Sequence, residues 1–153
     1  MVIIMAISTI IKTIKEIHPK DLILVKIGSF YHVYGKDAYI ISYLFGYKLK
    51  KFEKEYVTCG FPINCISRIT AKLEEKKINY IILDRRNNYE EDEKLDNRNL
   101  NQYDLFYEKA KKYVNLKIRI DNIYETLING LENEDTKEKV VKIEDIVYER
   151  RKI

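Results

Sequence analysis

KIGSFYHVY, residues 26–34, joins two β-prone segments through a Gly-Ser pair. The segment before it, Leu-Ile-Leu-Val at 22–25, is strongly apolar, and the residues after the Gly-Ser pair are aromatic or β-branched. Two such runs around a Gly-Ser pair predict a β-hairpin with a two-residue turn. Because side chains alternate along a strand, Phe30 and His32 should share one face, with Tyr31 on the opposite face.

This hairpin has two interpretations. A flat aromatic ring with a polar group two positions later suits stacking on a nucleic-acid base, with one hydrogen bond to the base edge. Alternatively, the hairpin is half-buried and its aromatic rings belong to the hydrophobic core, where such side chains are common. The hairpin residues by themselves leave both interpretations open.

Length and charge point to a small globular protein with an uneven charge distribution. The chain has 153 residues, of which 46% are hydrophobic and 34% charged, and its net charge is +4. This length fits one domain, with room for an appended tail. Residues 1–86 hold 15 Lys and Arg against 8 Asp and Glu, whereas residues 87–153 hold 13 against 16. A polyanionic partner should therefore bind the first half of the chain.

Several classes of protein are disfavoured by what the sequence contains. Cys59 and Cys65 form no CxxC pair, so we expect no disulfide framework and a reducing cytoplasmic location. The two histidines show no metal-ligand spacing, so no metal or other cofactor is expected. The apolar residues 1–7 are too few to span a bilayer and lack the features of a signal peptide, so no membrane partner is expected. The scattered carboxylates show no catalytic spacing, so we do not expect an enzyme such as a nuclease.

The first half of the chain alternates between helical and strand patterns. Asp37 is a plausible N-cap for the second of three predicted helices, and Gly46 should end that helix. Besides the hairpin, the patterns predict helices at 7–17, 37–45 and 64–76, and strands at 47–52, 56–59 and 78–83. We therefore predict an α/β (α+β) fold with a mixed β-sheet and flanking helices, followed by C-terminal helices.

The second half is predicted to be helical after a polar loop. Residues 87–101 are polar and acidic, which favours a mobile surface loop. Apolar periodicity then predicts two helices, a polar linker and a short amphipathic helix at 140–149. The predicted organisation is a core at 1–86, an acidic loop and two packing helices completing the domain at 87–132, and a charged linker with an amphipathic tail at 133–153.

The order of short motifs over residues 10–86 resembles the N-terminal mismatch-recognition domain of the MutS family of DNA mismatch repair proteins. No part of the sequence resembles the connector, lever, clamp or ATPase domains of that family. The motifs that carry the resemblance are His18-Pro19, Gly28-x-Phe30-Tyr31-x-x-Tyr34, Asp37-Ala38, Leu49-x-Lys51, Cys59-Gly60-x-Pro62 and Asp84-Arg85.

The resemblance assigns roles to the hairpin residues. In that family a Phe-x-Glu motif wedges the Phe beside a mispaired base, and the Glu hydrogen-bonds that base. Phe30 is the corresponding wedge, but His32 stands at the Glu position and Ser29 where Asp is usual. An imidazole can donate or accept a hydrogen bond and can become cationic near phosphate. We therefore expect His32 to raise general affinity for nucleic acid and to weaken discrimination for mispairs.

These considerations lead to one predicted function and one alternative. The chain is predicted to be a DNA-binding module that inserts Phe30 beside a mispaired or distorted base of double-stranded DNA, with weak and salt-dependent affinity and with other repair proteins as further candidate partners. The alternative is a protein-interaction or regulatory module that retains the fold without mismatch recognition. The basic candidates are Lys26, Lys48, Lys50, Lys51, Lys54 and Arg68. The predicted DNA-binding residues are Phe30, Tyr31, His32, Lys26, Lys50 and Lys51.

Overall fold

The computed structural model describes residues 7–53 and 56–149. Lys54, one of the predicted basic residues, lies outside these ranges. The chain divides into two compact units, unit 1 (Met1–Val114) and unit 2 (Asn115–Ile153), and each unit is described by itself. The predicted domain boundaries at residues 86 and 132 stay predictions.

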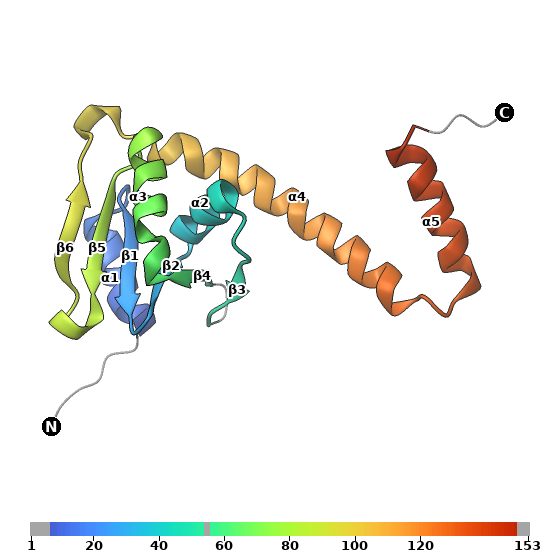
Figure 1. Cartoon of the computed structure of the whole chain (residues 1–153), viewed down its shortest axis with the longest axis horizontal. Helices are drawn as coiled ribbons and strands as arrows, with labels where there is room; N and C mark the ends of the chain where they lie inside the picture. The colour runs from blue at the N-terminus through green and yellow to red at the C-terminus, as the bar shows by residue number, and fades with distance from the viewer. Residues whose placement is uncertain (1–6, 54–55, 150–153) are drawn as a thin grey trace, which may run out of the picture. The chain divides into compact units, whose positions relative to one another are not determined.

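Over its described residues, unit 1 contains one six-stranded mixed sheet with the strand order β3-β4-β2-β1-β5-β6 (Figure 1). β1 and β5 are parallel, and the other neighbouring pairs are antiparallel. The sheet and its helices confirm the predicted α/β (α+β) class. The strands are β1 (Leu22–Ile27), β2 (Phe30–Tyr34), β3 (Lys50–Lys51), β4 (Val57–Pro62), β5 (Tyr80–Asp84) and β6 (Glu90–Leu95).

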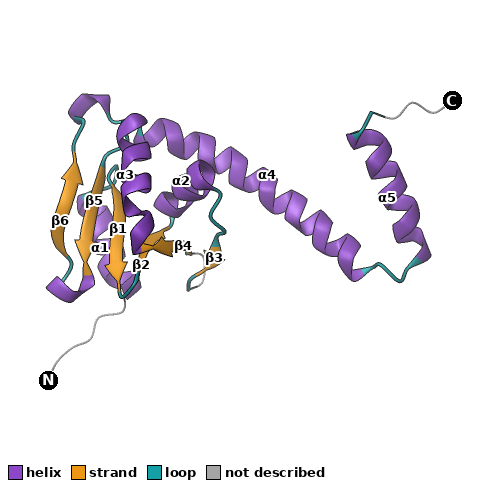
Figure 2. Ribbon diagram, viewed as in Figure 1, coloured by secondary structure: helices purple, strands orange, loops and turns teal. Residues whose placement is uncertain are grey.

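Helices cover both faces of this sheet (Figure 2). One face, called the α1 face, packs against Ile11 of α1. The other, called the α2/α3 face, packs against α2, α3 and the first part of α4, as far as Ala110. The helices are α1 (Ile7–Ile17), α2 (Lys36–Phe45), α3 (Ile66–Glu75), α4 (Tyr103–Asn129) and α5 (Glu134–Val147), with short 3₁₀ turns η1 (Ile63–Cys65), η2 (Arg85–Asn87) and η3 (Arg98–Leu100).

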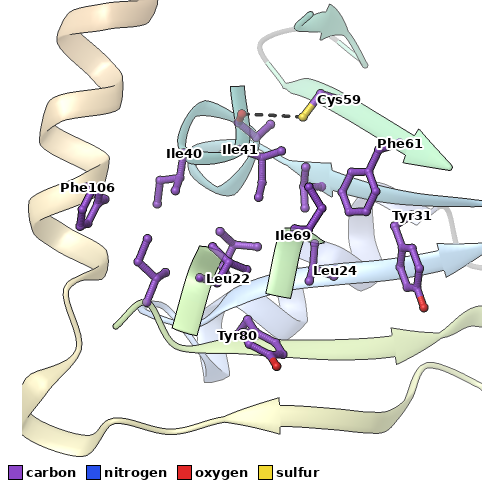
Figure 3. Close-up of a cluster of buried hydrophobic side chains, with 14 of the residues drawn as sticks. Leu22, Leu24, Tyr31, Ile40, Ile41, Cys59, Phe61, Ile69, Tyr80 and Phe106 are labelled. Atoms are coloured by element: carbon purple, nitrogen blue, oxygen red, sulfur yellow. Dashed lines mark hydrogen bonds between the residues drawn. The ribbon is translucent and has the colours of Figure 1, made fainter. Parts of the chain in front are cut away.

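The larger hydrophobic core lies between the sheet and the helices that cover its α2/α3 face (Figure 3). Leu22 and Leu24 of β1 are fully buried there, beside Ile69 of α3. Alternate residues of β1 face the smaller cluster under α1, so all four residues 22–25 are buried. This two-sided burial explains why β1 reads as an unbroken apolar run.

A buried ion pair ties α1, α2, β1 and α4 together. The Asp37 carboxylate accepts hydrogen bonds from Lys15 Nζ and from the Ile23 backbone N–H, both at 3.0 Å, and from the Tyr103 hydroxyl. Burial raises the pKa of Asp37, and the Lys15 ammonium opposes that rise. The prediction that Asp37 is an N-cap was wrong: Gly35 is the N-cap of α2, and the Asp37 side chain points inward to this network.

Three strand predictions needed correction. The predicted strand at 56–59 is longer than expected and continues to Pro62 in β4, because β4 pairs with β2 as far as the Phe30–Pro62 pair. The predicted strand at 47–52 is reduced to β3. The predicted acidic loop at 87–101 contains β6, which pairs with β5 at the edge of the sheet. Backbone pairing with a buried neighbour outweighs an unfavourable composition, and charged side chains suit an exposed edge strand.

The two helices predicted between 105 and 131 are one helix, α4. Residues 115–119, Asn-Leu-Lys-Ile-Arg, contain no Gly or Pro, so nothing in the sequence interrupts the helical hydrogen bonds. The predicted tail helix begins earlier than expected, at Glu134. No helix in the described ranges combines the length and apolarity that crossing a bilayer requires.

Candidate nucleic-acid interface

The β1–β2 hairpin holds Phe30 at the end of the sheet. Gly28, in the turn, has φ +61, a conformation that favours glycine. The Ser29 carbonyl accepts a hydrogen bond of 3.0 Å from the Ile63 N–H, so the turn is fixed to the end of β4. The Phe30 side chain is 45% exposed although it lies in a strand paired on both sides. The hairpin therefore presents an exposed ring from a rigid support.

His32 and Tyr34 continue the row of rings along the α1 face. The centroids of Phe30 and His32 are 6.4 Å apart, as are those of His32 and Tyr34. Tyr34 is buried, whereas His32 is half-buried. Gly60 lies opposite His32 on β4, and a Cβ atom at Gly60 would lie 3.2 Å from His32 Nδ1. The missing side chain leaves room for the imidazole to lie over the β4 backbone.

His32 favours its neutral form in the free protein. Burial lowers the pKa of His32, and the Lys50 ammonium lowers it further. Lys50 is exposed and pairs with Thr58 of β4, which in turn pairs with Tyr34 of β2. Residues paired directly across strands point to the same face, so Lys50 belongs to the α1 face together with Phe30 and His32.

The other three predicted residues lie on the opposite, α2/α3 face. Tyr31 is 6% exposed and stacks on Phe61 at 5.7 Å. Lys26 is the β1 partner of Tyr31 and is half-buried. Lys51 is exposed and pairs with Val57, which packs against the larger core. Strand alternation thus divides the six predicted residues into two groups of three.

The electrostatic surroundings of the two groups differ. Burial raises the pKa of Tyr31, and carboxylates of Asp92, Asp84 and Glu93 raise it further. Asp84 is also the β5 partner of Lys26. Lys26 and Tyr31 therefore lie in acidic surroundings, which weaken attraction to phosphate on that face.

Arg85 and Arg86 are cations beside the hairpin that the sequence analysis did not select. Because β5 is parallel to β1, with Asp84 paired to Lys26, the two arginines that follow lie at the same end of the sheet as the Phe30 turn. Both are exposed. The Arg85 charge opposes the rise that burial causes in the pKa of Tyr34. A prediction that the strands at 22–25 and 78–83 pair in parallel would have identified these two arginines.

The remaining basic candidates are less favourably placed. Arg68 of α3 donates a hydrogen bond of 2.6 Å to the Tyr47 hydroxyl and lies over the Phe45 ring, so its charge is engaged on the α2/α3 side. Lys48 is exposed between α2 and β3. β3 and the acidic β6 form opposite edges of the sheet, so β6 does not cover the edge that carries Lys50. In the described ranges, no three His, Cys, Asp or Glu side chains converge as metal ligands.

Comparisons with known proteins identify the family of this chain. Residues 8–105 match the family described as MutS domain I. The chain is also similar to the DNA mismatch repair protein MutS of Rickettsia prowazekii (strain Madrid E), with 32% identity over 87 residues. That alignment covers 54% of this chain and 10% of the relative, so the match spans about a tenth of the relative's length. With an exposed hairpin aromatic on a six-stranded mixed sheet and a match over more than half of its residues, the chain belongs to the MutS domain I family.

Proposed function

We propose that this chain is a DNA-binding module that inserts Phe30 beside a mispaired or distorted base of double-stranded DNA. The observation that carries the proposal is the exposed Phe30 ring on the same sheet face as His32 and Lys50, in a member of this family. The proposed partner is double-stranded DNA, the proposed location is the cytoplasm, and other repair proteins are further candidate partners. The proposed activity is binding without catalysis.

Insertion of the ring requires a compensating attraction. Separating two stacked base pairs costs a few kcal/mol, and less where a mispair has already weakened the stack. Lys50 on the α1 face, together with the exposed Arg85 and Arg86 at the end of the sheet near the turn, would neutralise phosphates and offset this cost. Three phosphate contacts correspond to a slope of about −3 in a plot of log affinity against log salt. Binding should therefore be weak at physiological salt and much stronger at low salt.

His32 is proposed to contact the base or an adjacent phosphate. Burial and Lys50 lower its pKa in the free protein, and a nearby phosphate would favour its protonated form. A cationic imidazole attracts matched and mismatched DNA alike. His32→Glu should therefore lower affinity for matched duplex more than for mismatched duplex and raise the selectivity ratio. An unchanged ratio would contradict this role.

Tyr31, Lys26 and Lys51 take secondary roles in the proposal. Tyr31 would position the hairpin through its stacking on Phe61 rather than touch DNA. Lys26 and Lys51 would reach phosphate only where DNA passes over the end or edge of the sheet onto the α2/α3 face. Substituting either lysine by Ala should therefore reduce affinity less than Lys50→Ala.

The experiment that tests the proposal is a fluorescence-anisotropy titration of the full chain with matched, mismatched and single-stranded DNA at two salt concentrations. Base–aromatic stacking is worth about 1–3 kcal/mol, so Phe30→Ala should weaken binding to mismatched duplex roughly 5- to 150-fold. Leu100→Ala is the matched control, because Leu100 is 60% exposed. It follows the end of β6 that lies away from the Phe30 turn.

The outcomes separate the two candidate functions. Loss of binding in Phe30→Ala, with an unchanged circular dichroism spectrum and an unchanged Leu100→Ala control, supports insertion of the ring. A parent chain that binds no DNA at low salt would overturn the proposal and favour the protein-interaction alternative. If Phe30→Ala bound DNA as tightly as the parent, DNA binding would stand but insertion of the Phe30 ring would be contradicted.

A further inference from the structure

Unit 2 exposes a broad apolar stripe on α4. At about 100° per residue, the members of this stripe fall within roughly 140° of the helix circumference. Such a width is typical of a helix that packs against a protein core rather than one that faces water. The α4 stripe consists of Leu116, Ile120, Ile123, Tyr124 and Ile128, each between 45% and 63% exposed.

α5 leaves most of the α4 stripe uncovered. Among the described residues of α5, Thr136 beside the Gly130 turn is the one that is buried. Beyond the turn, a cleft of about 430 Å³ separates the two helices, with Ile123 on the α4 side and Ile143 on the α5 side. Only one edge of the stripe therefore lines this cleft, and the remainder faces away from α5.

α5 carries an apolar stripe of its own. Thr136, Val140, Ile143 and Val147 follow one another at intervals of four, three and four residues, which is the spacing of a coiled-coil seam. Ile143 and Val147 are 37% and 65% exposed, and the adjacent Ile146 is 77% exposed. Within unit 2, Thr136 is buried, Val140 is half-buried and Ile143 lines the cleft opposite Ile123, so the exposed part of the α5 stripe is Ile143 and Val147, with Ile146 beside them.

The size of this surface matches that of a stable interface. The exposed apolar residues of this surface are the five of the α4 stripe together with Ile143, Ile146 and Val147 of α5, and on average they are a little over half exposed. At about 150 Å² per side chain, the lower end of the range for aromatic residues, they present on the order of 700 Å². A standard protein–protein interface buries about 800 Å² on each partner. Isolated apolar side chains on a surface need no explanation, but a continuous patch of this size usually marks an interaction site.

The charges beside the α5 seam identify the occupant. Lys137 and Glu144 are seven residues apart and occupy the same heptad position next to the seam. In the described part of the chain neither side chain forms an ion pair, whereas Lys139 and Lys142 pair with Asp135 and Glu138 within α5. An antiparallel copy of α5 would place its own Glu144 beside Lys137, and by symmetry its Lys137 beside Glu144.

We propose that two copies of this chain associate through unit 2, forming a four-helix bundle in which the two α5 helices run antiparallel and the α4 stripes are buried. Self-association would hold whether or not unit 1 binds DNA. If unit 1 does bind DNA, the dimer would carry two Phe30 hairpins, and tethering them would raise the apparent affinity for DNA without any new contact to the bases.

Sedimentation equilibrium of the full chain over a dilution series tests the proposal. The parent should show twice the chain mass of 18.3 kDa. Ile120→Glu, in the middle of the α4 stripe, should give a monomer with an unchanged circular dichroism spectrum. Ile118→Glu is the matched control, because Ile118 is 47% exposed on the opposite side of α4, and it should remain a dimer.

A charge exchange tests the antiparallel arrangement. Lys137→Glu should weaken the dimer at least tenfold by placing like charges together, and adding Glu144→Lys should restore it. Interfaces of this size have affinities from about micromolar to picomolar. A parent chain that is monomeric at about 100 μM would overturn the proposal, as would equal disruption by Ile118→Glu and Ile120→Glu. A double variant that stays as weak as Lys137→Glu would overturn the antiparallel pairing of α5.

Discussion

Asp37→Ala should be among the most destabilising single substitutions in unit 1. It removes the acceptor of three hydrogen bonds and leaves the Ile23 N–H and the Lys15 ammonium without their carboxylate. The Lys15 side chain is 17% exposed and keeps a 2.7 Å hydrogen bond to the Asp21 carbonyl, so its charge is only partly compensated. Breaking a buried ion pair typically costs about 3–5 kcal/mol. This is a large part of the roughly 5–15 kcal/mol that stabilises a domain.

Urea denaturation at pH 7, followed by far-ultraviolet circular dichroism, would measure the loss in free energy of unfolding. Asp37→Asn should cost less than Asp37→Ala, because the amide keeps an acceptor for the Ile23 N–H and removes a charge whose pKa burial raises. Asp104→Ala is the matched control. Asp104 also lies in the first turn of a helix and pairs with a lysine, Lys20, at 2.7 Å, but both side chains are 65% exposed. An exposed pair contributes about 0–1 kcal/mol.

Two results would refute this reasoning. If Asp37→Ala lowered the free energy of unfolding by no more than Asp104→Ala, the buried carboxylate would not be a major link between the helices and β1. If Asp37→Asn cost more than Asp37→Ala, the hydrogen-bonding geometry would not be the source of the stability.

Four further predictions concern the hairpin surface. Folding lowers the pKa of His32, so the contribution of this residue to the free energy of unfolding should be present above pH 6.5. That contribution should be lost as the pH falls from 6.5 toward the folded-state pKa. Urea titrations of the parent and of His32→Asn at several pH values would measure the difference. DNA affinity of the parent should rise over the same fall in pH, and that of His32→Asn should not, as anisotropy would measure. Gly60→Ala should displace the imidazole, since its Cβ would lie 3.2 Å from both His32 Nδ1 and the Tyr31 carbonyl oxygen, and its DNA affinity should fall toward that of His32→Ala. Arg85→Ala and Arg86→Ala should each reduce the salt slope of DNA binding by about 1, and an unchanged slope would exclude a phosphate contact.

Sequence periodicity was sufficient for the local elements of unit 1. The Gly28-Ser29 pair between two β-prone runs predicted the hairpin, and the isoleucine spacing at 7–17 predicted α1, because both signals are local in the chain. The apolar run before Asp84 likewise predicted a buried strand. The signal failed at β6, whose acidic residues lack strand propensity and are held in the sheet by hydrogen bonds to β5. It also failed at α4, where two separate apolar patterns suggested two helices although the backbone forms one.

The sequence by itself identified the candidate residues for contact with a nucleic acid: an aromatic ring at Phe30, His32 two positions later, and a basic first half of the chain. Only the tertiary structure decided which of them share a surface. Strand pairing separates Lys26, Tyr31 and Lys51 from Phe30, His32 and Lys50, and it brings Arg85 and Arg86 beside the turn. The physical reason is that alternation fixes the face of each residue within a strand, whereas the register and direction of neighbouring strands depend on backbone contacts between segments far apart in the chain.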